Sequence, residues 1–322
     1  MAPAGPSIAL VIVLPDGEGA VESLMPRLRD LRPSPREIIA VGGRQADSPG
    51  RKSAGKRLRI VAGESSRKDG EREGGLNQAA AWNRGCAEVS SALVVFLAHD
   101  GVPAEADWLE RLTGPFDDAQ VAATYGRQEP LQHDPLAAFR MADRFGHSAE
   151  RHRARLNDPP VGAAPGFSLG NAAIRWSVWR GIHFNEHFAT GADREWARQA
   201  LLASYTIAYV PQALVRRAEQ PSVGELAREA LLSGWNDARM GLSRDSQLTG
   251  ISLVARRAAW HLLKTGNARL LPRLGGEALA QVGAYRLGRR LHQLAPSLRN
   301  RIAPEIAHEE PRRELSDWER AA

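Results

Sequence analysis

The sequence has one cysteine, Cys86, among its 322 residues. A single thiol excludes an internal disulfide framework and a four-cysteine zinc site. Cys86 lies in an alanine-rich stretch with helical character, which indicates packing. The apolar run near the start, 8–14, is too short to cross a bilayer and has no basic leader before it. We therefore expect a first strand rather than a signal peptide, and a chain that stays in the cytoplasm.

The bulk composition is that of a globular protein, with 43% hydrophobic and 25% charged residues. The length allows one large domain plus an appendage, or two domains. The net charge of +6 and a sequence pI of about 9.9 favour an anionic partner: nucleic acid, anionic lipid or a phosphorylated substrate. No repeat of fixed period is present.

The first half of the chain alternates strands with helices. Such alternation predicts right-handed crossovers and a doubly wound layer. The predicted strands are 8–14, 37–41, 58–61 and 93–97, and the predicted helices are 19–31, 76–89 and 108–112.

The strand 93–97 carries the strongest functional signal. It is apolar on both faces, as in the centre of a parallel or mixed sheet covered by helices. Its carboxyl end, where such sheets bind ligands, runs into His99 and Asp100, which can meet a cation or a phosphate. We expect Pro103 to break the strand.

The second half becomes regular after residue 166, where a strand, a turn and a helix start are predicted, followed by a helix and a final strand. Asp193 stands near the start of that helix, where the dipole favours the ionised carboxylate. After Pro221 the predicted segments are helical: 223–240, 251–265 and 274–294. We expect a domain over 1–220, a helical extension over 221–298 and a weakly ordered tail over 299–322.

Seven segments resemble, in the correct order, the family 2 glycosyltransferases of GT-A fold, nearest to bacterial rhamnosyltransferase-like members. They are SIALVIVLPDGEGAVESLMPRL, IIAVGG, LNQAAAWNRG, LVVFLAHDGVPAEADWLERL, VAATYGRQEP, GNAAIRWSVW and GADREWARQALLASYTIAYVP. The resemblance covers roughly residues 7–217 and implies an α/β fold: a doubly wound mixed sheet with helices on both faces, followed here by a C-terminal helical segment.

This resemblance also implies an activity: inverting transfer of a sugar, rhamnose-like in this branch, from a nucleotide diphosphate donor. The acceptor is a hydroxyl of a polysaccharide, a lipid-linked glycan or another cell-surface glycan. A carboxylate must accept the hydroxyl's proton, and positive charge must stabilise the departing diphosphate. By position, the base is Asp193. The last member of the family's metal-binding acidic triplet is Asp100, and His99 is a possible second ligand.

Four positions depart from the family pattern. Gly42 replaces the carboxylate that holds the nucleotide base, Ala98 the first acid of the triplet, Ala192 the acid before Asp193, and Arg216 a late histidine. Arg216 or Arg217 can hold a diphosphate bidentately without metal. Dependence on Mg²⁺ or Mn²⁺ and metal independence both stay open, and no organic cofactor is expected.

Further site residues follow from the resemblance, each with a structural alternative such as a turn, a surface ion pair or core packing. For the nucleotide they are Pro15, Asp16, Gly42 and Asn83, and for the acceptor or sugar they are Arg127, Gly170, Asn171 and Trp196.

The C-terminal helices combine basic and apolar side chains. This pattern fits a helix on an anionic membrane leaflet, at the inner face of the plasma membrane, and equally a helical cover on the first domain. The basic side chains Arg67, Lys68 and Arg72 alternate with acids, which indicates a solvated loop and no nucleic-acid contact.

Three classes of function stay open: an active glycosyltransferase, a catalytically silent relative that binds sugar nucleotide or a partner protein, and a basic interaction protein. Gly42 is the feature that favours the silent relative.

Overall fold

A computed structural model describes residues 6–14, 26, 28, 30–42, 58–62, 77–145, 152–154, 167–188, 190–218, 221–239 and 244–306. The predicted helix 19–31 falls almost wholly outside these residues, as do Pro15, Asp16 and the basic loop 67–72. The chain forms two compact units. The first takes in 1–133, 141–186 and 192–219, and the second takes in 134–140, 187–191 and 220–322.

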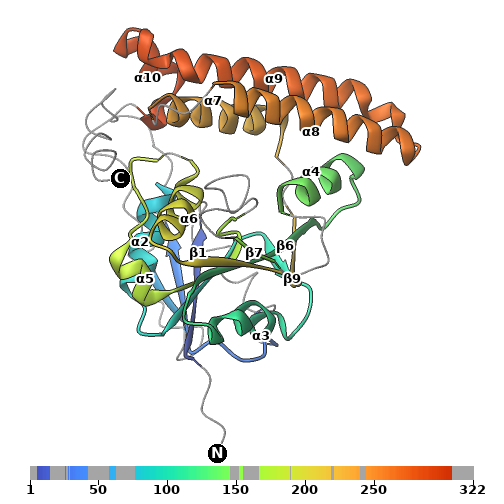
Figure 1. The fold of residues 1–322 in the computed structure, drawn as a ribbon. Helices are drawn as coiled ribbons and strands as arrows, with labels where there is room; N and C mark the ends of the chain where they lie inside the picture. The colour runs from blue at the N-terminus through green and yellow to red at the C-terminus, as the bar shows by residue number, and fades with distance from the viewer. Residues whose placement is uncertain are drawn as a thin grey trace, which may run out of the picture. The chain divides into compact units, whose positions relative to one another are not determined.

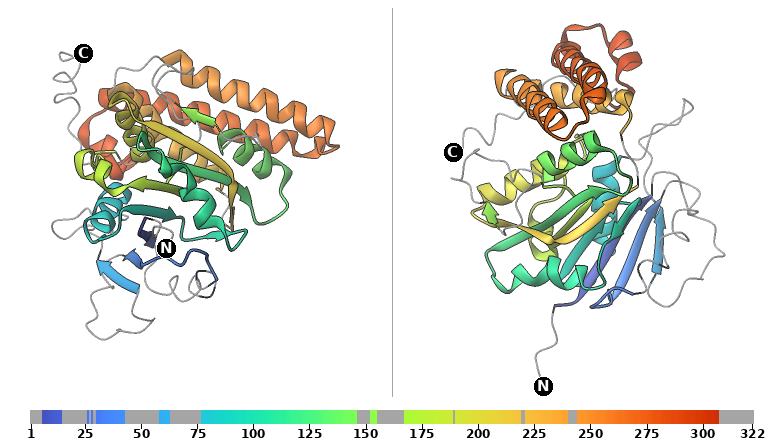
Figure 2. Two further views of the ribbon diagram at one scale, coloured as in Figure 1. Left: turned by 60° about the horizontal axis from the view of Figure 1, so that its bottom comes forward. Right: turned by 90° about the vertical axis from the view of Figure 1, so that its right-hand side faces the viewer.

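The first unit is built on a mixed, nine-stranded sheet with the order β3-β2-β1-β4-β8-β6-β9-β5, with β7 pairing β9 (Figures 1 and 2). β1, β2, β3 and β4 are parallel, whereas β8 runs antiparallel to both β4 and β6. The strands are β1 Ile8–Leu14, β2 Glu37–Gly42, β3 Leu58–Ala62, β4 Leu93–Leu97, β5 Gly101–Pro103, β6 Val121–Pro130, β7 His152–Ala154, β8 Asn171–Arg175 and β9 Thr206–Arg217.

Helices cover both faces of this sheet because its central strands are apolar on both sides. On one face, Leu10 and Val95 join a buried cluster with Trp108 and Leu112 of α3. On the other face α2 packs so closely that a Cβ on Gly85 would lie 2.5 Å from Val11. The helices of this unit are α2 Gln78–Ala87, α3 Trp108–Thr113, α5 Trp176–Gly181, α6 Ala192–Leu202 and the end of α4 Pro135–Phe145.

The α/β class that the sequence predicts is confirmed, with one local correction at Pro103. β4 ends at Leu97, and Gly101–Pro103 is a short separate strand, β5, which pairs antiparallel with β9. Proline is tolerated there because β5 lies at the end of the strand order, where the missing N–H breaks no ladder.

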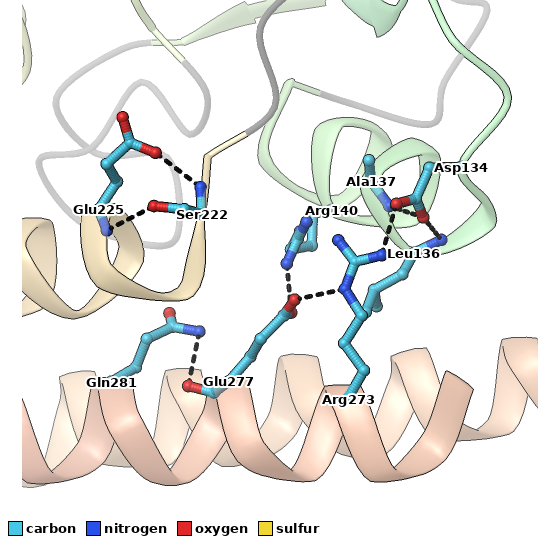
Figure 3. Close-up of polar contacts among 9 residues, drawn as sticks. All are labelled: Asp134, Leu136, Ala137, Arg140, Ser222, Glu225, Arg273, Glu277 and Gln281. Atoms are coloured by element: carbon cyan, nitrogen blue, oxygen red, sulfur yellow. Dashed lines mark hydrogen bonds and ion pairs between the residues drawn. The ribbon is translucent and has the colours of Figure 1, made fainter. Parts of the chain in front are cut away.

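The second unit is helical, with α7 Val223–Arg239, α8 Arg244–Lys264, α9 Leu271–Arg290 and α10 Pro296–Ile302. α7 and α9 approach closely because Gly234 and Gly288 carry no Cβ, which would collide with the backbone of the opposite helix. Ser222 and Glu225 form a capping box at the start of α7: the Ser222 N–H donates to Glu225 Oε2 at 2.7 Å (Figure 3). The first residues of the tail predicted from 299 belong to α10, where Arg299 is buried.

A polar cluster joins the segment 134–140 to α9 inside the second unit (Figure 3). Glu277, buried at 2% exposure, pairs with Arg140 and accepts from Arg273 Nε at 3.0 Å. Arg273 Nη1 also reaches Asp134 Oδ2 at 2.7 Å. Burial raises the pKa of Asp134, but hydrogen bonds from Ala137 and Arg273 outweigh it and leave the pKa below its usual value.

No helix among the described residues has the length and apolar character needed to span a bilayer.

Candidate active site

Asp100 lies in a turn that the sheet positions next to Arg217. The Gly101 N–H donates to the Ala98 carbonyl at 2.8 Å, so the chain turns at His99 and Asp100 directly after β4. Gly101 then pairs with Arg217 in the antiparallel ladder between β5 and β9. Pairing of these short strands therefore brings residues 117 positions apart in the sequence side by side.

Arg217 forms a charge-assisted contact with Asp100. Its Nε lies 2.5 Å from Asp100 Oδ1, and its Nη1 donates to Gln128 Oε1 at 3.2 Å. The Asp100 side chain is 5% exposed and that of Arg217 is 23% exposed. The guanidinium is thus fixed on one side while part of it reaches the surface.

The loop before β8 packs against this pair. The Ala98 N–H donates to the Gly170 carbonyl at 3.0 Å. A Cβ on Gly170 would lie 3.1 Å from Arg217 Nη1 and 3.2 Å from Gln128 Oε1. The absence of a side chain at Gly170 therefore leaves space for the guanidinium of Arg217.

Asp193 contacts the same loop through Leu169, the residue before Gly170. It lies in the first turn of α6, where the helix dipole favours a carboxylate. Its Oδ1 accepts from the Arg194 N–H at 2.8 Å, and the Leu169 N–H points at its Oδ2 from 3.4 Å. Leu169 and Gly170 thus link Asp193 to the Asp100–Arg217 pair.

Two of the predicted sugar residues are buried and make contacts within the protein. Asn171 is 0% exposed: it accepts from Trp108 Nε1 and donates to the carbonyls of Arg127 and Ala213, so its polar atoms hold four elements together. Trp196 is also 0% exposed, donates to the Ile182 carbonyl and stacks on Phe167.

Two predicted donor-binding residues, Asn83 and Arg216, lie away from the Asp100–Arg217 contact or are bonded to other parts of the protein. Asn83 donates to the Phe184 carbonyl and to Glu186 Oε1 and accepts from Trp179 Nε1, which fixes it to a neighbouring loop. Arg216 is exposed and precedes Arg217 in β9. Because successive strand side chains point to opposite faces, Arg216 points away from Asp100.

Three other predicted residues, Gly42, His99 and Arg127, lie at or after a strand end or within a strand. Gly42 ends β2 and is buried beside Leu14. His99 is half-buried next to Asp100, and Arg127 pairs with Glu129 at 2.8 Å.

Sequence reasoning missed Gln128, which is 1% exposed and bonded to Arg217. It lies in the same YGRQ segment as Arg127, the charged residue for which a phosphate or acceptor contact was predicted. The alternation of β6 is the signal that separates the two, because it buries Gln128 where Arg127 is only half-buried.

The described residues do not fit a divalent metal. Within them, no three His, Cys, Asp or Glu side chains gather as a ligand set. Ala98 offers no side-chain oxygen, and the guanidinium of Arg217 lies where it would repel a cation at Asp100. Mg²⁺ binds through carboxylate oxygens and substrate phosphates, and the carboxylate of Asp100 is already paired with Arg217.

Burial raises the pKa of Glu195, two residues after Asp193, despite a hydrogen bond from Gln199 and the charge of Arg198. A carboxyl group whose pKa is raised in the folded state contributes stability below its unfolded pKa and loses it as pH rises through the folded value. We expect Glu195→Gln to be more stable than the parent protein at neutral pH, and the difference to vanish near pH 4, as measured by thermal melts across pH.

Glu37 is the matched control of opposite sign in the same unit. Burial raises its pKa, but hydrogen bonds from Ser91 and Ser90 outweigh this and lower it. Glu37→Gln should therefore lower the stability of the folded protein at neutral pH, and the difference from the parent protein should disappear in acid. If Glu195→Gln changes the melting temperature equally at pH 4 and pH 8, burial of the Glu195 charge is not the cause of the change in stability.

Comparison with known proteins gives two relatives of the same kind. The O-antigen chain rhamnosyltransferase RfbN of Salmonella typhimurium is 30% identical over 128 residues, 38% of this chain and 40% of the relative. WbaN of Salmonella anatum, with the same description, is 36% identical over 131 residues, 39% of this chain and 41% of the relative. The chain thus spans about two fifths of the length of the curated relatives it matches. No family model matches the sequence.

Solved structures with a looser likeness include the mannosyltransferase PcManGT from Pyrobaculum calidifontis in complex with GDP-Man and Mn²⁺, at 14% identity and a TM-score of 0.47, over 95% of this chain and 79% of that one. S. aureus TarS 1–349 in complex with UDP has 11% identity and a TM-score of 0.46, over 89% of this chain and 91% of that one.

Both sequence relatives carry a glycosyltransferase description. Within that class, the resemblance to bacterial rhamnosyltransferases is confirmed, since both relatives carry that description.

Proposed function

We propose that this protein is an inverting glycosyltransferase that moves rhamnose or a similar sugar from a nucleotide diphosphate donor to a hydroxyl of a cell-surface glycan, in the cytoplasm. One observation carries the proposal: Leu169 and Gly170, consecutive in the chain, connect Asp193 to the Asp100–Arg217 pair. The transfer needs a base and a fixed cation, and here the two are connected through one loop.

In the proposed reaction, the acceptor oxygen attacks the anomeric carbon as the bond from that carbon to the diphosphate oxygen breaks. Asp193 accepts the proton of the attacking hydroxyl. Arg217 stabilises the charge that develops on the diphosphate. Of its five N–H groups, the contacts within the described residues use Nε–H and one on Nη1, so others can donate to phosphate oxygens.

Asp100 and Gln128 position Arg217 rather than contacting the donor. A guanidinium held from one side loses less rotamer freedom when it binds a phosphate than a mobile side chain does. This role differs from the metal ligation that the family pattern implies for Asp100, and it follows from the poor fit of the described residues to a metal ion.

The test is a panel of sugar nucleotides, each with EDTA and with added Mn²⁺ or Mg²⁺. A ligand that binds only the folded protein raises its melting temperature. We expect one class of donor to raise the melting temperature equally in both conditions, and release of the nucleoside diphosphate with acceptor to continue in EDTA. Activity that disappears in EDTA and returns with metal contradicts the metal-independent mechanism while leaving the glycosyltransferase proposal intact.

A silent relative that binds donor without transfer is the second candidate. Gly42 favours it, because this residue ends β2 without the carboxylate that the family uses to hold the base. Donor binding without turnover toward any acceptor, unchanged in Asp193→Asn, would support this reading.

A further inference from the structure

One face of α8 is exposed and carries both apolar and basic side chains. Ala258 and Leu262 point into the second unit, where they pack with Leu136 and Leu274. At about 100° per residue, the opposite face of the helix is centred near Trp260. It consists of Leu253, Arg256, Arg257, Trp260, Leu263 and Lys264, all exposed.

The apolar members of this face are large and unusually accessible. Trp260 is 62% exposed, Leu263 53% and Leu253 40%. The Lys264 ammonium lies over the Trp260 ring, 5.0 Å from its centroid, so the cation and the aromatic ring sit together at the surface. Isolated exposed leucines are ordinary, but this set is aligned on one helix face.

The charge around this face has one sign. No Asp or Glu occurs from 246 to 276, whereas Arg256, Arg257, Lys264, Arg269 and Arg273 do. The next acid is Glu277, and it is buried between Arg140 and Arg273, which neutralise it (Figure 3). Arg256 and Lys264 of α8 are therefore exposed in a stretch of sequence without acids, and an anionic partner complements them.

The mixture of side chains distinguishes between anionic partners. Nucleic acid needs cations and stackable rings, and gains little from exposed leucines. A bilayer surface holds tryptophan and leucine at the boundary between headgroups and acyl chains while lysine and arginine remain among the phosphates.

We propose that the exposed face of α8 binds the surface of an anionic lipid bilayer, with Trp260 and Leu263 entering the interface and Arg256 and Lys264 contacting lipid phosphates. Arg269, in the short turn Ala268–Leu270 that follows α8, adds a third cation. This surface is separate from the residues assigned to sugar transfer, so the proposal stands or falls independently of the proposed function.

The test uses the full chain and co-sedimentation with phosphatidylcholine vesicles, with and without phosphatidylglycerol. We expect binding only when phosphatidylglycerol is present, weakened by salt. The variant Arg256→Gln/Lys264→Gln/Arg269→Gln should bind about 100-fold more weakly, given the usual contribution of each cation near an anionic leaflet. Trp260→Ser/Leu263→Ser should also lose binding, although it keeps every charge.

Matched controls separate this surface from overall charge and hydrophobicity. Arg32→Gln/Arg36→Gln/Arg84→Gln removes the same charge from exposed positions of the first unit, and Leu202→Ser removes a leucine that is 41% exposed there. Both should bind vesicles as the parent does. Melting temperatures check that every variant folds, which is expected because the altered side chains are exposed.

Three results would overturn the proposal. The first is equal binding to vesicles with and without phosphatidylglycerol, or none to either. The second is an oligonucleotide that binds as tightly as the vesicles do. The third is a self-association of the chain, seen by light scattering, that Trp260→Ser/Leu263→Ser abolishes, since this would assign the face to a second copy.

Discussion

Asp193→Asn should lower the rate of sugar transfer by about 100-fold or more, because general-base catalysis by a positioned carboxylate typically contributes that much or more. Asparagine is nearly isosteric and can still accept from the Arg194 N–H at the start of α6, so the loop through Leu169 should keep its position. Donor affinity should change little, since the diphosphate is assigned to Arg217. The measurement is the initial rate of transfer beside the donor dissociation constant from calorimetry.

The matched control for this variant is Glu195→Gln, on the same helix and two residues further. Glu195 accepts a hydrogen bond from Gln199 at 2.9 Å, and glutamine retains that bond. This change should leave transfer unaltered. If Asp193→Asn transfers sugar at the parent rate, Asp193 is not the base and the mechanism proposed here is wrong.

Arg217→Gln should weaken donor binding about 10- to 100-fold, the range expected when hydrogen bonds from a charged group to phosphate are lost. It should also lower the free energy of unfolding by about 3 kcal/mol, because it removes the cation that contacts the buried carboxylate of Asp100. Calorimetry with the donor measures the first effect, and urea unfolding measures the second.

Arg216→Gln is the control that the strand itself provides. It removes the same charge one residue away on the opposite face of β9, so donor binding and stability should stay close to those of the parent. Adding Asp100→Asn to Arg217→Gln should restore much of the lost stability, since neither charge is then left alone. Donor binding by Arg217→Gln that equals the parent's would remove the arginine from the proposed mechanism.

The local sequence was sufficient to predict several strands and the positions of the two carboxylates, Asp100 and Asp193, within their elements. β1, β2 and β4 lie where continuous runs of buried Val, Ile and Leu predicted them, because such runs are stable only in a sheet covered on both faces. Asp193 at a helix start and Asp100 after a strand were also predicted, since strand ends and helix starts are set by nearby residues.

The partners of these residues could not be predicted in the same way. Nothing in the sequence indicates that three residues, Gly101 to Pro103, form β5, because a strand so short is stable only through its pairing with β9. That pairing, between residues more than 100 positions apart, is what brings Arg217 to Asp100. The burial of Asn171 and Trp196 could not be predicted for a related reason: their residue types suit a sugar site, and only the packing around them shows that they are buried.

The sequence by itself determined the α/β class, the strand that leads to Asp100 and the basic character of the C-terminal helices, since hydrophobic periodicity and charge act over a few neighbouring residues. Only the tertiary structure decided that Arg217 rather than Arg216 pairs with Asp100, that Gln128 supports it, and that one loop links both to Asp193. Those relations depend on strand register and on which face each side chain takes, and register is fixed by contacts between segments far apart in the chain.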